Sequence, residues 1–253
     1  MAEQLAYAII TPYSLHKSRT GGILARLIAR TRLELVGARM FAPSPELVKE
    51  YSEAIVSAND PQDRRVQELL REYILQNFQP DPKTGRRRRV MMLLFKGQDA
   101  VRTLRSVVGN LSPDRRSGET IRDTYADMIL DGAGNVRYFE PAVLAPPNAE
   151  EAEQKLKLWA RYSDTDGGIL QNTIAYGPAE KPQRTLVLIK PDNFRFPTGR
   201  PGNVIDFFSR TGLYIVGIKL HMMSVAQAME FYGPVRDILR TKLKDVVAKQ
   251  SKE

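Results

Sequence analysis

Residues Thr185–Asp192 read TLVLIKPD, and the rest of the chain repeats or extends the unit that they begin. The leucine, valine and isoleucine side chains predict a buried strand that ends at Pro191. Lys190 stands at the end of this strand, where a compact ammonium charge on a rigid element suits a phosphate. A loop with two glycines, an apolar-periodic helix from Val204 and a second strand over Leu213–Leu220 follow. The stretch therefore predicts a strand–loop–helix–strand unit.

The same unit occurs near the start of the chain. A strand over Leu5–Ile10, a glycine-preceded apolar helix and a strand over Leu33–Phe41 follow one another there. The LxxVG motif of that second strand recurs 180 residues later, at Leu213. At an offset of 179, Thr11 corresponds to Lys190. An internal repeat accounts for this pattern and predicts two copies of one scaffold.

The residues that follow the first unit complete the first copy. Val90–Phe95 is the most hydrophobic stretch and predicts a central strand. The helix after it carries Arg105, a short helix carries Arg122, and Asn148–Ala160 predicts a closing helix with an acidic start. The second copy, in contrast, continues only into a basic helix predicted over Val235–Lys249.

The domain organisation follows from these patterns. We predict a first domain over residues 1–160, a polar and turn-rich linker over 161–183, and a partial second unit over 184–253. With 42% hydrophobic and 26% charged residues in 253, the chain can bury a substantial core. The absence of cysteine excludes disulfides and thiol chemistry. The apolar start is too short for a signal peptide or a membrane span, so we expect a cytoplasmic protein without a membrane partner.

The charge of the chain favours anionic partners. The net charge is +9, and Arg86–Arg89 is a run of four arginines. Such a run indicates either an RNA or phosphate contact or a solvated loop before a strand. We favour the loop, because no aromatic residues that could stack on bases are interleaved with the arginines.

Several motifs resemble the nucleoside diphosphate kinase family. In the second copy they are Ile189–Asp192 (IKPD), Gly212–Leu220 (GLYIVGIKL) and the spacing from Ser224 to Tyr232. Four segments of the first copy resemble the family's central strand, the helix before its nucleotide-covering loop, its GTIR segment and its closing helix. These are Val90–Gly97, Ala100–Gly109, Gly118–Asp127 and Glu150–Trp159.

The resemblance implies an α+β fold. Its architecture is a ferredoxin-like βαββαβ antiparallel sheet with helices and the spatial strand order 4-1-3-2, here duplicated with the second copy incomplete. In that order the third strand lies between the first two, so the second copy has a gap in its sheet. We expect residues beyond Glu253, another chain or the first copy to fill that gap, because unpaired strand edges are a liability.

The resemblance also implies site residues. The family transfers a phosphoryl group from one nucleoside triphosphate to a diphosphate through a phosphohistidine, with arginines, a lysine and Mg²⁺ on the phosphates. Arg105, Arg122 and Asn135 match the family's phosphate and ribose ligands in the first copy. Lys190 and Tyr232 match its lysine and tyrosine in the second copy.

The first copy departs from the family pattern at its chemical centre. Tyr138 occupies the position of the phosphate-carrying histidine, and Thr11 occupies that of the strand-end lysine. Leu111 replaces a loop threonine, and Lys155 replaces the glutamate that orients the histidine. The two histidines of the chain, at positions 16 and 221, lie elsewhere. Because a tyrosine with a pKa of about 10 is scarcely ionised at neutral pH, we expect no useful phosphoryl transfer.

The sequence therefore predicts a catalytically degenerate nucleoside diphosphate kinase-like protein that binds nucleoside di- or triphosphates with Mg²⁺. One alternative is an active kinase in a longer chain or an assembly that supplies the missing histidine. Another is a basic RNA-binding or structural module. By resemblance we also expect a homo-oligomer.

Overall fold

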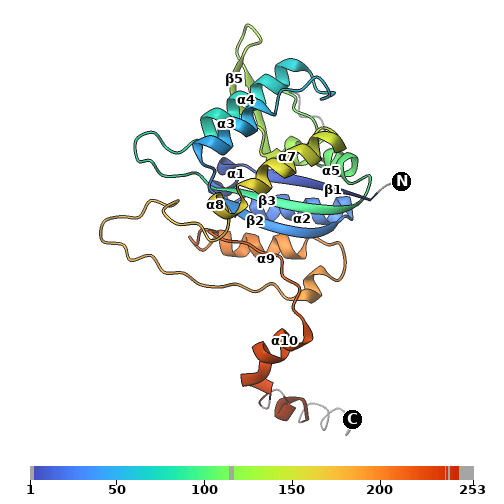
Figure 1. Ribbon diagram of the computed structural model, residues 1–253, viewed down its shortest axis with the longest axis vertical. Helices are drawn as coiled ribbons and strands as arrows, with labels where there is room; N and C mark the ends of the chain where they lie inside the picture. Colours follow the sequence, from blue (N-terminus) through green and yellow to red (C-terminus); the bar gives the residue numbers. More distant parts are fainter. Residues whose placement is uncertain (1–2, 114–116, 237, 239, 245–253) are drawn as a thin grey trace. The chain divides into compact units, whose positions relative to one another are not determined.

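The computed structural model describes residues 3–113, 117–236, 238 and 240–244 (Figure 1). The chain divides into two compact units, residues 1–219 and residues 220–253. Arg115, Arg116 and the end of the predicted C-terminal helix, residues 245–249, lie outside the described residues. Among the described helices, none has both the length and the apolar character needed to cross a membrane.

A four-stranded antiparallel sheet forms the centre of the first unit. Its strands are β1 (Glu3–Ile10), β2 (Glu34–Phe41), β3 (Val90–Gln98) and β6 (Val143–Leu144), in the order β2-β3-β1-β6. The most hydrophobic strand, β3, pairs with β1 on one side and β2 on the other. With β6 as the fourth strand of the fold, this is the predicted order 4-1-3-2, and the predicted fold class is confirmed.

Alternate residues of β1 point to opposite faces of the sheet and enter two separate cores. Ala6, Ala8 and Ile10 join the core that α2 (Thr20–Thr31) and α5 (Ala100–Val108) cover. Tyr7 and Ile9 join the core that α3 (Pro45–Glu53), α4 (Arg64–Asn77) and α7 (Ala149–Arg161) cover.

The second core is rich in aromatic side chains. Trp159 on α7 packs edge-to-face against Phe41 at 5.0 Å and Tyr51 at 5.2 Å between ring centroids. Such pairs add stabilisation beyond their buried area. The predicted closing helix therefore lies over the sheet, and its single tryptophan fixes it there.

Short elements connect the larger ones. They are α1 (Pro12–His16), α6 (Ile121–Tyr125), the hairpin of β4 (Asp127–Leu130) and β5 (Val136–Glu140), and α8 (Ser163–Asp166). The beginning of the predicted linker then follows the edge of β2. Gly167 forms a bridge with Phe41, and the amide of Gly168 donates to the carbonyl oxygen of Met40 at 2.9 Å.

The two strands predicted in the second copy do not form, so that prediction is wrong. Residues 185–190 and 213–220 carry no strand assignment, and Leu186, Leu188 and Leu213 are 78%, 54% and 48% exposed. The physical reason is the gap anticipated above, because no described segment lies between them as β3 lies between β1 and β2. The helix of this copy does form, as α9 (Arg200–Ser209) after the 3₁₀ turn η1 (Pro191–Phe194), and it lies alongside α2 (Figure 1).

The second unit is small and largely helical in its described part. It contains α10 (Val225–Tyr232) and the 3₁₀ turn η2 (Gly233–Val235). The Ser224 hydroxyl accepts from the Gln227 amide at 3.2 Å while the Gln227 side chain accepts from the Ser224 amide at 2.9 Å. This reciprocal capping box fixes the start of α10.

Candidate functional site

Arg122 places a guanidinium inside the first unit. It lies on α6, whose first turn is capped because the Thr120 hydroxyl accepts from the Asp123 amide. The side chain is buried and donates to the carbonyl oxygens of Gly109 at 2.9 Å and Val143 at 3.1 Å. Its Nε has no hydrogen-bond partner, which is unusual for a buried polar atom. One donor of a buried cation is therefore available for a ligand.

Arg105 is brought beside Arg122 by the turn that ends α5. Its helix buries Val101, Leu104 and Val108 and leaves Arg105 half-buried at the edge of that face. Gly109 ends α5 at a φ of +85°, and a Cβ there would lie 2.8 Å from Thr120 Cγ2. Glycine thus allows the chain to reverse toward α6. No hydrogen bond or ion pair of the Arg105 side chain is seen with any described residue, so its guanidinium is also available.

The two arginines share one electrostatic environment. The pKa of Arg122 is lowered to about 9, first by burial and then by the neighbouring charge of Arg105, while the charge of Asp60 opposes both effects. Burial likewise lowers the pKa of Arg105, again opposed by Asp60. A positive charge is costly here because it is desolvated and faces a like charge. The pair therefore favours a bound anion.

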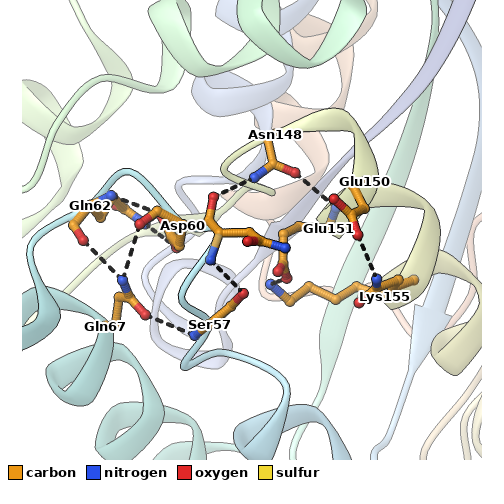
Figure 2. A network of polar contacts seen from close by, with 10 residues as sticks. Ser57, Asp60, Gln62, Gln67, Asn148, Glu150, Glu151 and Lys155 are labelled. Atoms are coloured by element: carbon orange, nitrogen blue, oxygen red, sulfur yellow. Dashed lines mark hydrogen bonds and ion pairs between the residues drawn. The ribbon is translucent and has the colours of Figure 1, made fainter.

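Asp60 opposes the positive charge of the pair, but in the described part of the chain its carboxylate forms no ion pair with either arginine. It accepts from the amide of Gln62 at 2.8 Å and from the Gln62 side chain at 3.0 Å. Figure 2 shows how the loop around it is fixed: Gln67 accepts from the Ser57 amide at 2.9 Å, and Asn148 donates to the carbonyl oxygen of Asn59 at 2.8 Å. The acid is thus held by α4 and the start of α7 rather than by the arginines.

Tyr138, which the resemblance predicts at the position of the family's histidine, lies on β5 and is 40% exposed. Its pKa is raised to about 12, first by burial and then by a hydrogen bond with the hydroxyl of Tyr13 and by the charges of Glu140 and Asp127. The phenol is therefore less acidic than an ordinary tyrosine. A nucleophilic or phosphate-carrying role is correspondingly disfavoured.

Glu140, on β5, places a carboxylate at the end of β1 beside Thr11, the position where the resemblance implies a lysine. Its carboxylate is buried and accepts from the Thr11 hydroxyl at 2.8 Å, the Tyr73 hydroxyl at 2.6 Å and the Ala142 amide at 3.0 Å. Burial raises the pKa of Glu140, and these hydrogen bonds oppose that effect. Sequence reasoning missed both Glu140 and Tyr73. The only available signal was a glutamate in the otherwise apolar stretch before Val143.

The remaining predicted residues are exposed or have partners other than the two arginines. Asn135 is exposed in the β4–β5 turn, where its side chain donates to Asp131 at 3.3 Å. Lys155 forms a buried ion pair with Glu151 at 2.6 Å. In the second copy, Lys190 is exposed before η1 and belongs to the first unit, whereas Tyr232 is exposed on α10 in the second unit.

The arginine run is only partly the solvated loop that the sequence favoured. Arg87 donates to the carbonyl oxygen of Ala42 at 3.0 Å and pairs with the buried Asp166 at 3.1 Å. Arg89 is buried, donates to the carbonyl oxygen of Ile215 and lies 5.4 Å over the ring of Tyr214. These two arginines therefore stabilise the fold through contacts within the chain.

One cavity among the described residues lies away from the arginine pair. Its volume is about 760 Å³, and it lies between residues 84–87 and residues 165–176. Arg87 is already paired there with Asp166. The arginine pair is thus a site defined by buried, unbalanced charge and not by a preformed large pocket.

Comparisons with known proteins agree on one group. A family model described as nucleoside diphosphate kinase matches residues 4–164 and 183–242. Similar solved structures include a nucleoside diphosphate kinase from Aquifex aeolicus, with 19% identity and a TM-score of 0.44 over 62% of this chain and 95% of that one. The enzyme from Borrelia burgdorferi with bound vanadate and ADP has 18% identity and a TM-score of 0.48 over 62% and 86%. A nucleoside diphosphate kinase family protein from Babesia bovis has 21% identity and a TM-score of 0.43, over 70% of this chain and 95% of that one. No curated protein matches the sequence.

Proposed function

Since the chain belongs to the nucleoside diphosphate kinase family, we propose that it binds nucleoside di- and triphosphates through Arg105 and Arg122 without transferring a phosphoryl group. The observation that carries the proposal is the buried guanidinium of Arg122, which has an unpartnered Nε and lies beside a second arginine. Phosphate oxygens would supply both the missing acceptor and the missing negative charge. Guanidinium–phosphate hydrogen bonds are among the stronger ones because both groups are charged.

The absence of transfer is proposed from the groups at the carrier position. With the pKa of Tyr138 at about 12, about one side chain in 10⁵ is ionised at pH 7. The strand-end residue Thr11 donates to a buried carboxylate instead of presenting a cation to a phosphate. His16 is exposed at the end of α1, and His221 belongs to the other unit. Neither imidazole replaces the missing carrier.

Mg²⁺, which the family resemblance implies, would come with the nucleotide. No group of three or more histidine, aspartate or glutamate side chains in the described part of the chain is arranged to hold a metal ion. Asp60, the acid nearest in effect to the arginines, is occupied by Gln62. Mg²⁺ commonly binds through substrate phosphates with few protein ligands. The chain's own contribution would therefore be to the phosphate oxygens.

Two variants on one helix test the binding site. Isothermal titration calorimetry with ADP and Mg²⁺ should show that Arg105→Gln weakens binding about tenfold or more, since hydrogen bonds to charged groups contribute about 1.5–3 kcal/mol. Arg102→Gln is the matched control on the same helix, because that side chain is 84% exposed and pairs with Asp99, the residue that precedes the helix. Binding that is absent at millimolar nucleotide, or equal in both variants, would contradict the proposal.

A separate assay tests the absence of transfer. The chain is mixed with ATP and a second nucleoside diphosphate, and formation of the new triphosphate is followed. We expect no turnover above the background without protein. Sustained turnover would instead support the alternative of an active kinase, with the histidine supplied by an assembly.

A further inference from the structure

The cavity of about 760 Å³ lies between the turn before β3 and the segment that begins in α8. Its volume falls within the range of roughly 300–1,000 Å³ that is typical of small-molecule sites. The lining residues come from 84–87 and 165–176, together with Ala42, and include neither Arg105 nor Arg122. The cavity is therefore a candidate site separate from the arginine pair.

Hydrogen bonds within one turn fix the first wall of this cavity. The carboxylate of Asp81 accepts from the amides of Lys83 at 3.0 Å and Thr84 at 2.9 Å. The amide of Asp81 donates to the carbonyl oxygen of Arg86 at 2.9 Å, and Gly85 reverses the chain at a φ of +65°. The backbone that carries Arg86 is thus held in place before any ligand binds.

The guanidinium of Arg86 is available to a ligand. The side chain is half-buried, and no hydrogen bond or ion pair of it is seen with any described residue. The other lining arginine, Arg87, pairs with Asp166 at 3.1 Å and donates to the carbonyl oxygen of Ala42 at 3.0 Å. Two arginines and one aspartate are the charged lining residues, so the lining carries a net charge of +1. A planar guanidinium with free donors suits a phosphate group.

Backbone hydrogen bonds hold the second wall. The amide of Gly168 donates to the carbonyl oxygen of Met40 on β2 at 2.9 Å. Leu170 is buried, and its amide donates to the carbonyl oxygen of Val216 at 2.8 Å. Asn172 then takes a φ of +53°, a left-handed conformation in which asparagine is enriched among non-glycine residues. This wall is therefore attached to the body of the unit up to the point where its polar side chains begin.

The second wall offers an aromatic ring and two side-chain amides, from Tyr176, Gln171 and Asn172. No hydrogen bond of either amide side chain is seen with any described residue, and Tyr176 is 47% exposed. Amide side chains both donate and accept, as the edge of a nucleobase requires, and an aromatic ring provides a face on which a base can stack. In the same segment, the buried hydroxyl of Thr173 also lacks a partner.

We propose that this cavity binds a nucleoside monophosphate, with the phosphate on Arg86 and the base against Tyr176 and the two amides. A cation on one wall and a ring with free amides on the other suit the two chemically different ends of such a ligand. One unpaired arginine suits a single phosphate, whereas the pair of Arg105 and Arg122 suits a di- or triphosphate. The chain thus binds a mononucleotide independently of the arginine pair.

Isothermal titration calorimetry of the full-length chain with AMP, in EDTA and without Mg²⁺, tests the phosphate end. Arg86→Gln should weaken AMP binding about tenfold or more, because it removes charge-assisted hydrogen bonds. Arg88→Gln is the matched control, since Arg88 is half-buried in the same run, loses the same charge and does not line the cavity. We expect Arg88→Gln to bind AMP as wild type does.

The base end is tested at the aromatic ring. Tyr176→Ala should weaken AMP binding about fivefold or more, the lower end of what base–aromatic stacking contributes. Tyr176→Phe keeps the ring and should bind as wild type does. Inorganic phosphate, which lacks the base, should bind at least about tenfold more weakly than AMP.

Three results would overturn the inference: no AMP binding at millimolar concentration, equal affinities of Arg86→Gln and Arg88→Gln, or phosphate bound as tightly as AMP. The variant Arg105→Gln separates this site from the one proposed above. Loss of AMP binding in Arg105→Gln with Arg86→Gln unchanged would assign AMP to the arginine pair and also overturn the inference. Loss in Arg86→Gln alone supports it, even if ADP with Mg²⁺ does not bind at Arg105 and Arg122.

Discussion

The two copies share a sequence pattern but reach different structures. Tyr7 and Ile9 on β1 are 1% and 0% exposed. At the equivalent positions 179 residues later, Leu186 and Leu188 are 78% and 54% exposed. The apolar character of the two stretches is similar, so the difference arises from their neighbours. β1 pairs with β3 along its whole length, and in the described residues nothing pairs with 185–189 in that way.

The helices of the two copies differ much less, and this contrast explains the difference between the strands. A helix satisfies its backbone hydrogen bonds internally, so α9 forms without the rest of its copy and needs only a surface for its apolar side. A strand must find its hydrogen bonds in another strand, and two or fewer strands are marginal in water. A partial copy of this fold therefore keeps its helix and loses its sheet.

The largest expected effect comes from weakening the packing of α7 on the sheet of the first copy, a sheet that the second copy lacks. Lys155→Ala on α7 should lower the free energy of unfolding by about 3–5 kcal/mol, because it leaves the buried carboxylate of Glu151 without its cation. Both side chains of this pair are at most 5% exposed, and α7 lies on β1. Urea unfolding followed by circular dichroism measures the change.

The same helix provides the control for this prediction. Lys157 pairs with Glu153 at the same i,i+4 spacing and the same 2.6 Å, but these side chains are 74% and 69% exposed. We expect no measurable change from Lys157→Ala, because exposed pairs contribute little. Equal losses of unfolding free energy from the two substitutions would mean that burial of the Lys155–Glu151 pair does not stabilise the first copy.

A smaller effect comes from one methyl group at equivalent positions of the two copies. Ile9→Val should cost about 0.5–1.5 kcal/mol of unfolding free energy, since Ile9 is fully buried. Leu188→Val, at the equivalent position 179 residues later, should stay within about 0.5 kcal/mol, as for surface substitutions. Urea unfolding of both variants compares them directly. A comparable loss from Leu188→Val would show that the second copy is packed after all.

The sequence predicted the fold because its determinants are local patterns and a repeat. The hydrophobicity of Val90–Phe95 identified the central strand, and the family motifs implied the strand order. The strands of the second copy were predicted wrongly because an apolar stretch indicates a strand only if a partner strand exists. That information is not contained in Thr185–Ile189 itself. The implied strand order does predict a gap in the second copy, and in the structure Leu186 and Leu188 beside that gap are exposed.

The candidate site was predictable in part. The motif positions of Arg105 and Arg122 indicated two nearby cations, and the turn at Gly109 brings them together. The role of Asn135 as a ligand stays a prediction. Its hydrogen bond to Asp131 depends on the geometry of the β4–β5 hairpin, which the spacing of sequence motifs does not give. Glu140 was missed since a single buried acid has no pattern, and only its hydrogen-bond donors reveal it.

The smallest expected effect is a change in pH dependence at the end of the first strand, where Thr11 corresponds to Lys190. Because burial raises the pKa of Glu140 above its ordinary 4.5, the folded state binds more protons than the unfolded state between those two values. The contribution of Glu140 to stability therefore falls as pH rises through that window. Glu140→Gln removes this contribution, so wild-type stability relative to the variant should decrease with rising pH.

Urea unfolding of wild type and variant at a series of pH values measures that difference. Lys190→Gln is the control in the second copy, because its side chain is exposed and should leave the pH dependence of wild type unchanged. If Glu140→Gln also leaves it unchanged, the carboxylate is not desolvated in the folded state. The end of β1 would then be as open to water as its exposed counterpart at Lys190, and the contrast between the two copies would not extend to this position.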